Sequence, residues 1–165
     1  MFFRRLENGF NYVYKVEPGG QRRVVADPIA TLHSCSTDGE WVIVGGPVFT
    51  AYNTREQRKI RVCEQCWPNW SRDGKYLFVT LPPSAEEGKT SAHHTGRKVH
   101  AIAMRGSATL LAFPAEGITA ENVGKLPGVT EIEFNSDPFR SANDLTTYPI
   151  VRGTVQRNIY RIPIP

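Results

Sequence analysis

The sequence of 165 residues has few cysteines, no long apolar stretch and no signal-peptide pattern, and each absence argues against a class of protein. It holds three cysteines. These cannot all pair within one chain, which weakly favours a reducing compartment such as the cytoplasm. No stretch approaches the ~20 apolar residues of a membrane-spanning helix, so no membrane span is expected. The amino-terminal MFFRRLENGF lacks the apolar core and small-residue cleavage site of a signal peptide.

Strong charge bias is also missing. Twenty Lys and Arg against sixteen Asp and Glu give a net charge of +4, and the basic residues are scattered. No nucleic-acid-reading motif accompanies them, so no nucleic-acid partner is expected. With 40% hydrophobic and 22% charged residues, the composition is that of a globular chain, which we interpret as a single domain over residues 1–165.

Helix signals are few, whereas short apolar runs bounded by Gly, Pro, Asn and Asp are frequent. Such runs are typical of β-strands. They predict strands at 12–16, 22–25, 41–44, 60–62, 76–81, 99–104, 109–113, 130–134 and 159–164. One short helix is expected at about 119–126, where Thr119 caps the start and Pro127-Gly128 ends it.

The strand pattern repeats along the chain. Ser36-Thr37-Asp38-Gly39 precedes Trp41, and Ser71-Arg72-Asp73-Gly74 precedes Tyr76, 35 residues later. Asp-Gly supplies the positive φ of a tight hairpin, and the Ser and Asp side chains bind the amides of the turn. We place these turns between successive units, which then span about 1–40, 41–75, 76–148 and an incomplete 149–165. Two insertions, at about 82–98 and 114–128, lengthen the third unit.

A repeat of this length made of short strands is typical of propeller blades. The segments STDGEWVIV, WSRDGKYLFV and NYVYKVEPGGQRRVV resemble the TolB-like, WD-repeat-like β-propellers of bacterial proteins. The closing RNIYRIPIP is similar to the carboxyl-terminal end of propellers in large bacterial proteins, some of which carry a serine/threonine kinase, although no kinase motif is present here. The resemblance implies an all-β fold, a partial β-propeller of three to four antiparallel blades.

The pair Cys63-x-x-Cys66 is the strongest chemical signal. It can supply half of a zinc site, completed by His93 and His94 together with His100; it can form a disulfide; or it can be two strand-end thiols with no chemical role. Adjacent histidines on an extended chain point to opposite sides, and they lie in a polar insertion. We therefore favour strand-end thiols, and expect no metal and no cofactor.

Two further residues are candidates for surface contacts. Trp67 lies outside the repeat pattern that places Trp41 and Trp70 in the core, and His33 lies on a strand that enters a turn. Cys35 is expected to be a core residue, since no base accompanies it. No G-x-S-x-G nucleophile motif and no calcium-loop spacing occur.

These features together favour a non-catalytic binding or scaffold module. Its partner would be a protein or peptide that contacts the face bearing the two insertions, and the terminal blades would allow self-association. Two alternatives stay open: a zinc-assisted hydrolase that uses Cys63, Cys66 and the His93-His94 loop, and a fragment of a larger propeller with no function of its own.

Overall fold

The computed structural model describes residues 1–7, 10–20, 22–24, 31–56, 58–82 and 97–134. This part of the chain is mostly β and forms three antiparallel sheets. The first sheet has the order β1-β2-β3, the second β4-β5-β6-β7, and the third β8-β9-β10-β11. The strands are β1 Phe2–Glu7, β2 Phe10–Val16, β3 Arg22–Val24, β4 Thr31–Cys35, β5 Trp41–Gly45, β6 Val48–Asn53, β7 Lys59–Glu64, β8 Trp67–Trp70, β9 Tyr76–Thr80, β10 Arg97–Ala103 and β11 Val129–Phe134.

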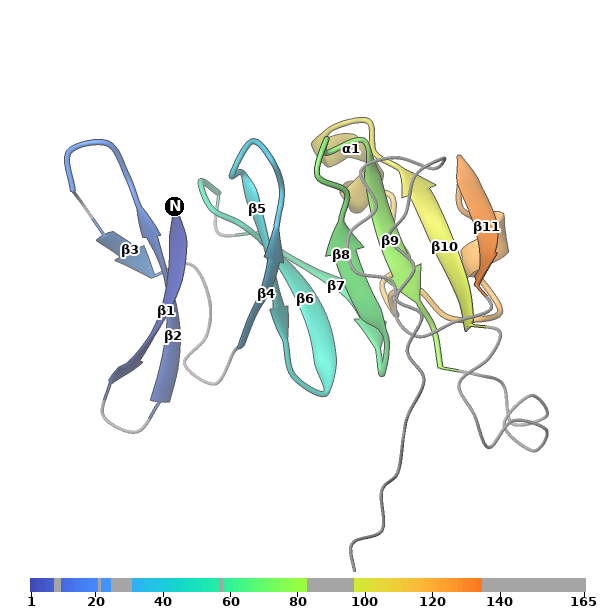
Figure 1. The fold of residues 1–165 in the computed structure, drawn as a ribbon, viewed down its shortest axis with the longest axis horizontal. Helices are drawn as coiled ribbons and strands as arrows, with labels where there is room; N and C mark the ends of the chain where they lie inside the picture. Colours follow the sequence, from blue (N-terminus) through green and yellow to red (C-terminus); the bar gives the residue numbers. More distant parts are fainter. Residues whose placement is uncertain (8–9, 21, 25–30, 57, 83–96, 135–165) are drawn as a thin grey trace, which may run out of the picture.

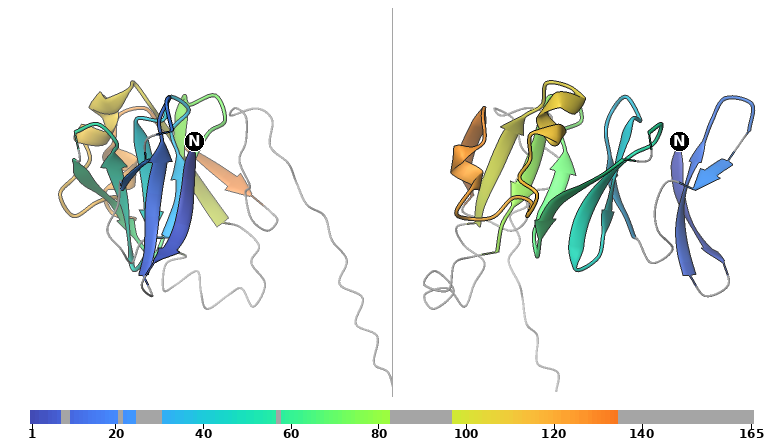
Figure 2. Two further views of the ribbon diagram at one scale, coloured as in Figure 1. Left: turned by 90° about the vertical axis from the view of Figure 1, so that its left-hand side faces the viewer. Right: turned by 180° about the vertical axis from the view of Figure 1, so that it is seen from behind.

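Every sheet is a simple meander in which each strand pairs with its neighbour in sequence. The three sheets stand side by side in chain order, so the second sheet has a neighbour on each face (Figures 1 and 2). We call the packing of the first sheet on the second the first junction, and that of the second on the third the second junction.

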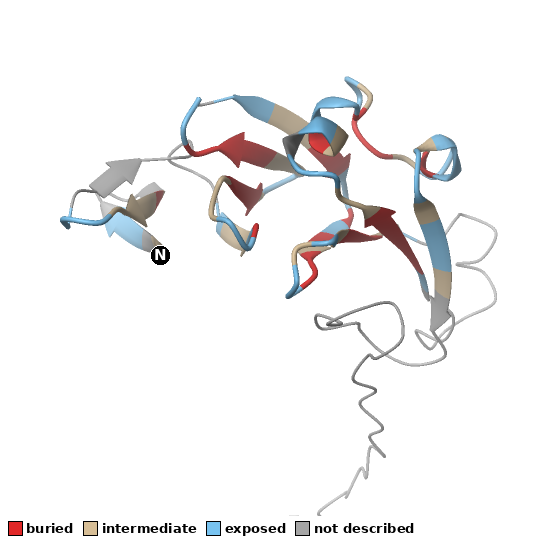
Figure 3. Cartoon of the chain, turned by 90° about the horizontal axis from the view of Figure 1, so that it is seen from above, coloured by how far each residue is buried: buried red, intermediate tan, exposed pale blue. Residues whose placement is uncertain are grey.

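Alternation along the strands decides which side chains enter each junction. In β5, Val42 and Val44 pack with Val13 of the first sheet, whereas Trp41 and Ile43 belong to the core shared with the third sheet. Because both faces are covered, β5 reads as a continuous apolar run rather than an alternating one. Most buried residues accordingly belong to the second and third sheets and the segments packed on them (Figure 3).

The two junctions differ in size. The first holds the buried Val13, Val42, Val44 and Tyr52, with Phe2 and Leu32 packed against them. The core of the second holds fourteen buried residues: Trp41, Ile43, Ala51, Val62, Cys63, Cys66, Trp70, Leu77, Val79, Ile102, Leu110, Phe113, Ile118 and Val123. A separate apolar cluster of Phe78, Val99 and Ala101 occupies the other face of the third sheet.

The sheets differ from the units predicted from the sequence. The turns at 36–39 and 71–74 join β4 to β5 and β8 to β9, so they lie inside sheets and not between them. The second and third sheets therefore begin one strand earlier than the units 41–75 and 76–148. The predicted strand ranges omit four strands, β1, β4, β6 and β8. The last of these contains Pro68, which argues against a strand; β8 accommodates it at the end of its sheet.

The segment after β10 also departs from expectation. Residues 109–113 were predicted as a strand, but Ser107–Leu111 form the short helix α1, preceded by Gly106 at φ 65°. Leu110 and Phe113, three positions apart, bury one side of this helical segment in the second junction. A five-residue apolar run is compatible with the periodicity of a strand or of a helix, and here the helix forms because it buries Leu110 and Phe113.

The helix expected at 119–126 is shorter than predicted. Only Val123–Lys125 are helical, as the single 3-10 turn η2. Its N-cap is Asn122 with no side-chain cap hydrogen bond, so Thr119 is not the cap predicted; the Thr119 carbonyl only accepts a hydrogen bond from the backbone N–H of Val123, at 3.0 Å. Extended Leu126 ends the turn, and Gly128 follows with φ 72°. The predicted strand 159–164, the partial unit 149–165 and most of the insertion 82–98 lie outside the described residues.

Candidate functional site

The two Ser-x-Asp-Gly turns adopt the same geometry. In the first, the Ser36 hydroxyl donates to Asp38 Oδ1 at 2.6 Å and accepts from the backbone N–H of Trp41 at 2.9 Å. In the second, Ser71 donates to Asp73 Oδ1 at 2.7 Å and accepts from the N–H of Tyr76 at 2.9 Å. Each side chain thus has its partners inside its own turn, which makes these residues structural.

The glycines of these turns have positive φ, 67° at Gly39 and 75° at Gly74. The turns also touch one another: a Cβ at Gly74 would collide with the Thr37 side chain, whereas a Cβ at Gly39 would meet only a ring carbon of Phe2, at 3.8 Å. The second sheet is therefore in contact with both its neighbours at this end. At Asp73, the hydrogen bond from Ser71 lowers the carboxyl pKa below its usual range, and the backbone N–H of Lys75 acts in the same direction.

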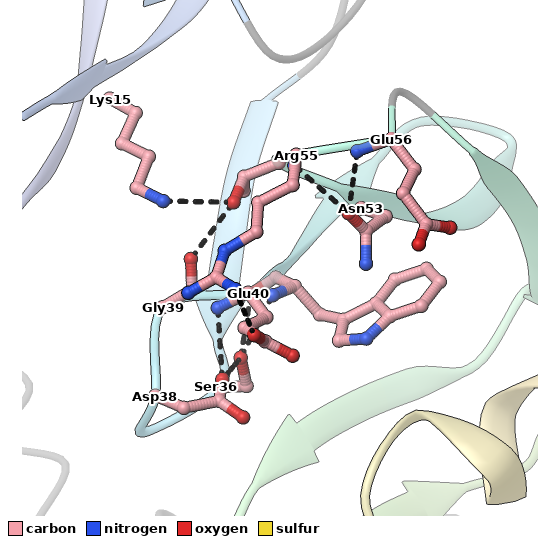
Figure 4. A network of polar contacts seen from close by, with 10 residues as sticks. Lys15, Ser36, Asp38, Gly39, Glu40, Asn53, Arg55 and Glu56 are labelled. Carbon is pink, nitrogen blue, oxygen red and sulfur yellow. Dashed lines mark hydrogen bonds and ion pairs between the residues drawn. The ribbon is translucent and has the colours of Figure 1, made fainter.

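A polar network connects the first turn to the first sheet (Figure 4). The Lys15 ammonium donates to Thr54 Oγ1 at 2.9 Å, and the Thr54 hydroxyl donates to the carbonyl of Gly39 at 3.0 Å. Asn53 Oδ1 accepts from the backbone N–H groups of Arg55 and Glu56, both at 2.9 Å. These bonds fix the β4–β5 and β6–β7 turns beside Lys15, and they are a structural link rather than a reactive site.

Cys63 and Cys66 form a disulfide, with their Cα atoms 6.0 Å apart. Cys63 lies near the end of β7, and Cys66 immediately precedes β8, so the bond spans the connection between the second and third sheets. Both residues are buried, at 0% and 1% exposure. Of the three alternatives drawn from the sequence, the structure adopts the disulfide. In this state neither sulfur is available as a zinc ligand, and His93 and His94 lie outside the described residues.

The insertion at 114–128 covers this disulfide instead of projecting as a recognition loop. The N–H of Ile118 donates to the carbonyl of Val62 at 2.7 Å, and Ile118 forms a parallel β-bridge with Cys63. Gly117 is needed here, because its φ is 84° and a Cβ would lie 3.0 Å from the Val62 oxygen. Ile118 and Val123 are buried in the second junction. Part of the third sheet's insertion therefore reaches back and binds the second sheet.

His33 lies between the second and third sheets, at a bulge in β4. Its ring meets that of Phe49 edge-on at 4.8 Å, and Phe49 reaches it across Gly45. Burial lowers the imidazole pKa, while the carbonyl of Pro68 in β8 favours the protonated form. Its Nε2 is buried and has no hydrogen-bond partner in the described part of the chain. His33 is thus a half-buried residue of the second junction rather than a surface residue.

Trp67 is the aromatic side chain with the greatest exposure among the described residues, at 51%. It begins β8 and pairs with Thr80 of β9. Since the 82–98 insertion follows β9 and leads into β10, Trp67 lies at the end of the third sheet where this insertion starts. Trp41 and Trp70 are buried, at 3% and 8% exposure, as the repeat pattern indicates for core residues.

Two other side chains differ from expectation: Cys35, and His100, which the zinc alternative placed with His93 and His94. Cys35, expected in the core, is a free, exposed thiol at the end of β4. His100 in β10 is buried beside Glu131, with 4.0 Å between its Nδ1 and a carboxylate oxygen. Burial lowers the His100 pKa, and Glu131 opposes that effect. The apolar neighbours of His100 in VHAIAM are the sequence signal that could have indicated its burial.

The described residues contain neither a group of three or more His, Cys, Asp and Glu suited to a metal ion nor a helix able to cross a membrane. Comparison with protein-family models, curated proteins and solved structures finds no match to this chain.

Proposed function

We propose that the three sheets are successive blades of a β-propeller and that the chain is a non-catalytic module that binds a protein or peptide. Four-stranded meanders stacked face to face, with the same Ser-x-Asp-Gly turn between the first two strands of the second and third sheets, support the blade assignment. Equivalent turns in successive sheets are the feature that distinguishes a repeat from an irregular stack of sheets.

The exposed position of Trp67 carries the binding proposal. A half-exposed tryptophan on a strand gives a rigid apolar contact of large area, and tryptophan is enriched among residues that dominate binding energy. Its place at the end of the third sheet that leads into the 82–98 insertion puts an anchor beside the point where this polar insertion begins. We therefore assign the partner contact to Trp67 and the 82–98 insertion, and not to 114–128, whose Ile118 and Val123 are buried in the second junction.

The zinc-assisted hydrolase finds no support in the geometry of this state, because the disulfide uses both sulfur atoms that the zinc site needs. The fragment hypothesis predicts broad, uncooperative melting, whereas a continuous second junction predicts a cooperative transition. A thermal melt followed by circular dichroism separates these two outcomes.

A selection from a random linear peptide library displayed on phage tests the binding proposal. We expect peptides selected on the purified chain to bind the Trp67→Ala variant at least about tenfold more weakly. Leu111→Ala is the matched control, because Leu111 is a large exposed residue of similar exposure, 48%, on the distant helix α1. Peptides that bind Trp67→Ala as tightly as the parent, or a selection that yields no binder, would reject Trp67 as the anchor.

Self-association through the terminal blades is a separate proposal with its own test. The outward side of the first sheet carries Phe3, Tyr12 and Tyr14, with Phe3 stacked on Tyr14 at 5.4 Å. A native mass spectrum is expected to show a multiple of the 18.5 kDa chain. A monomer across the accessible concentration range would reject self-association and leave the Trp67 proposal untouched.

A further inference from the structure

The Cys63–Cys66 disulfide joins two sheets at the point where the chain passes from one to the other. Within this four-residue ring, Gln65 has a φ of 48° and is the one non-glycine residue with positive φ in the described part of the chain. A left-handed conformation at Gln65 is unfavourable unless the surroundings hold it. The disulfide thus helps to hold a turn that the local sequence does not favour.

A second set of contacts closes over the disulfide from outside. Ile118, from the third sheet's insertion, donates its N–H to the Val62 carbonyl and forms a bridge with Cys63, and it is only 2% exposed. Gly117 lies so close to the Val62 backbone that a Cβ would be 3.0 Å from the Val62 oxygen. Trp41 and Trp70 belong to the same buried cluster. A soluble thiol therefore reaches neither sulfur while the segment 114–123 stays in place, because thiol–disulfide exchange requires direct access to a sulfur atom.

We propose that the Cys63–Cys66 disulfide is a redox-dependent latch of the second junction: a dithiol reductant opens it only after the segment 114–123 has released β7, and reduction weakens the binding of that segment in turn. The segment 114–123 shields the disulfide from the reductant, and the disulfide in turn stabilises the binding of the segment to β7. Loss of either is expected to loosen the connection between the second and third sheets, whatever partner the chain binds.

The exchange balances with the dithiol as the only co-reactant. One thiolate of the reductant attacks a cysteine sulfur, the protein S–S bond breaks, and a mixed disulfide forms. The second thiol of the reductant then attacks this mixed disulfide, which closes the reductant into its own ring and releases the second cysteine. The protein gains two electrons and two protons, both supplied by the reductant, and holds two buried thiols.

The first test compares the oxidised and reduced chain. Treatment with dithiothreitol, begun in mild denaturant and followed by refolding, is expected to lower Tm by about 4–8 °C, since a ring of this size contributes modestly to stability. In the reduced chain, the amide of Ile118 is expected to exchange its hydrogen faster. Cys35→Ser is the control, because this free thiol lies outside the junction and its loss should change neither quantity.

The second test measures access rather than stability. Gly117→Ala introduces a Cβ close to the Val62 oxygen at a positive φ, whereas Gly124→Ala, in the same insertion, meets nothing within 4 Å. In native buffer we expect dithiothreitol to reduce the Gly117→Ala disulfide about tenfold faster than that of the parent, because the strained segment opens more often. Gly124→Ala should match the parent.

Two results would overturn the latch. If the reduced chain keeps the parent Tm and the slow exchange at Ile118, the disulfide does not support the segment. If Gly117→Ala and the parent are reduced at the same rate, the segment does not control access. Both measurements use the full chain without cysteine substitution at 63 or 66, so a folding defect in a serine variant cannot obscure them.

Discussion

The first and second junctions unite the same kind of sheets but are built very differently. The first depends on a small apolar cluster around Val13 and on the Lys15–Thr54 hydrogen bond at 2.9 Å. The second combines a much larger buried core with a disulfide and the bridge from Ile118. Because buried apolar area is the main source of stability, the first sheet is expected to open before the other two separate.

Truncating a core side chain in each junction should give the largest effect and the clearest contrast. Leu77→Ala in the second junction is expected to lower the free energy of unfolding by about 3 kcal/mol and to affect the whole chain, because Leu77 is fully buried in the main core. Val13→Ala is expected to cost about 2 kcal/mol. Chemical denaturation measures both losses.

Amide hydrogen exchange then locates these losses. Val13→Ala should accelerate exchange in β1 and β2 while leaving β9 and β10 protected. Equal acceleration in the first and third sheets would mean that the junctions unfold together, and would contradict the comparison.

The two turn glycines allow a matched comparison at similar φ. Gly74→Ala is expected to destabilise the chain more than Gly39→Ala, because only the former adds a collision, with Thr37, to the cost of about 1–2 kcal/mol for a left-handed alanine. Thr37→Ala in the Gly74→Ala background should recover part of the difference. If both glycine variants have the same Tm, the turns are not in contact.

Acidification should weaken the second junction, where His33 lies, and the third sheet, which contains His100. Burial lowers both imidazole pKa values, so the unfolded chain binds protons at a higher pH than the folded chain. Stability is therefore present at neutral pH and decreases as pH falls through the ordinary histidine range, from about 7 to about 5. His100→Gln should flatten the dependence of Tm on pH; an unchanged profile would exclude His100 as a contributor.

The smallest effect is expected at the surface. The Arg55–Glu40 ion pair spans 3.1 Å, but the Arg55 side chain is 72% exposed. Arg55→Ala should therefore change the free energy of unfolding by less than about 0.5 kcal/mol, and added salt should reduce the change further. A larger loss in thermal melts would show that this ion pair of Figure 4 stabilises the chain more than its solvent exposure indicates.

Local chemistry made the turns and many of the strands predictable. Asp-Gly is a strong signal for a tight hairpin, and both Asp-Gly pairs of this chain form one. The apolar runs at 41–44 and 76–81 match β5 and β9 closely. The residues of a turn do not indicate which two strands of a sheet the turn joins. The position of each turn within its sheet depends on β4 and β8, which are short and offer weaker patterns, Thr31–Cys35 and the proline-containing Trp67–Trp70.

The arrangement around the disulfide was the least predictable part of the chain. Cys63-x-x-Cys66 has the same spacing whether it binds metal, forms a disulfide or does neither. The burial that distinguishes these states comes from Gly117 and Ile118, more than fifty residues further along the chain. No sequence pattern near residue 63 indicates that Gly117 and Ile118 lie beside Cys63 in the folded chain.

The bridge between Ile118 and Cys63 also affects how molecules of this chain meet one another. β7 is the last strand of its sheet, and an exposed strand edge is a template for strands of other molecules. By placing Ile118 against that edge, the chain occupies the Val62 carbonyl, an acceptor that would otherwise be open to a strand of another molecule. The insertion between β10 and β11 thus acts as an internal guard against intermolecular β-pairing.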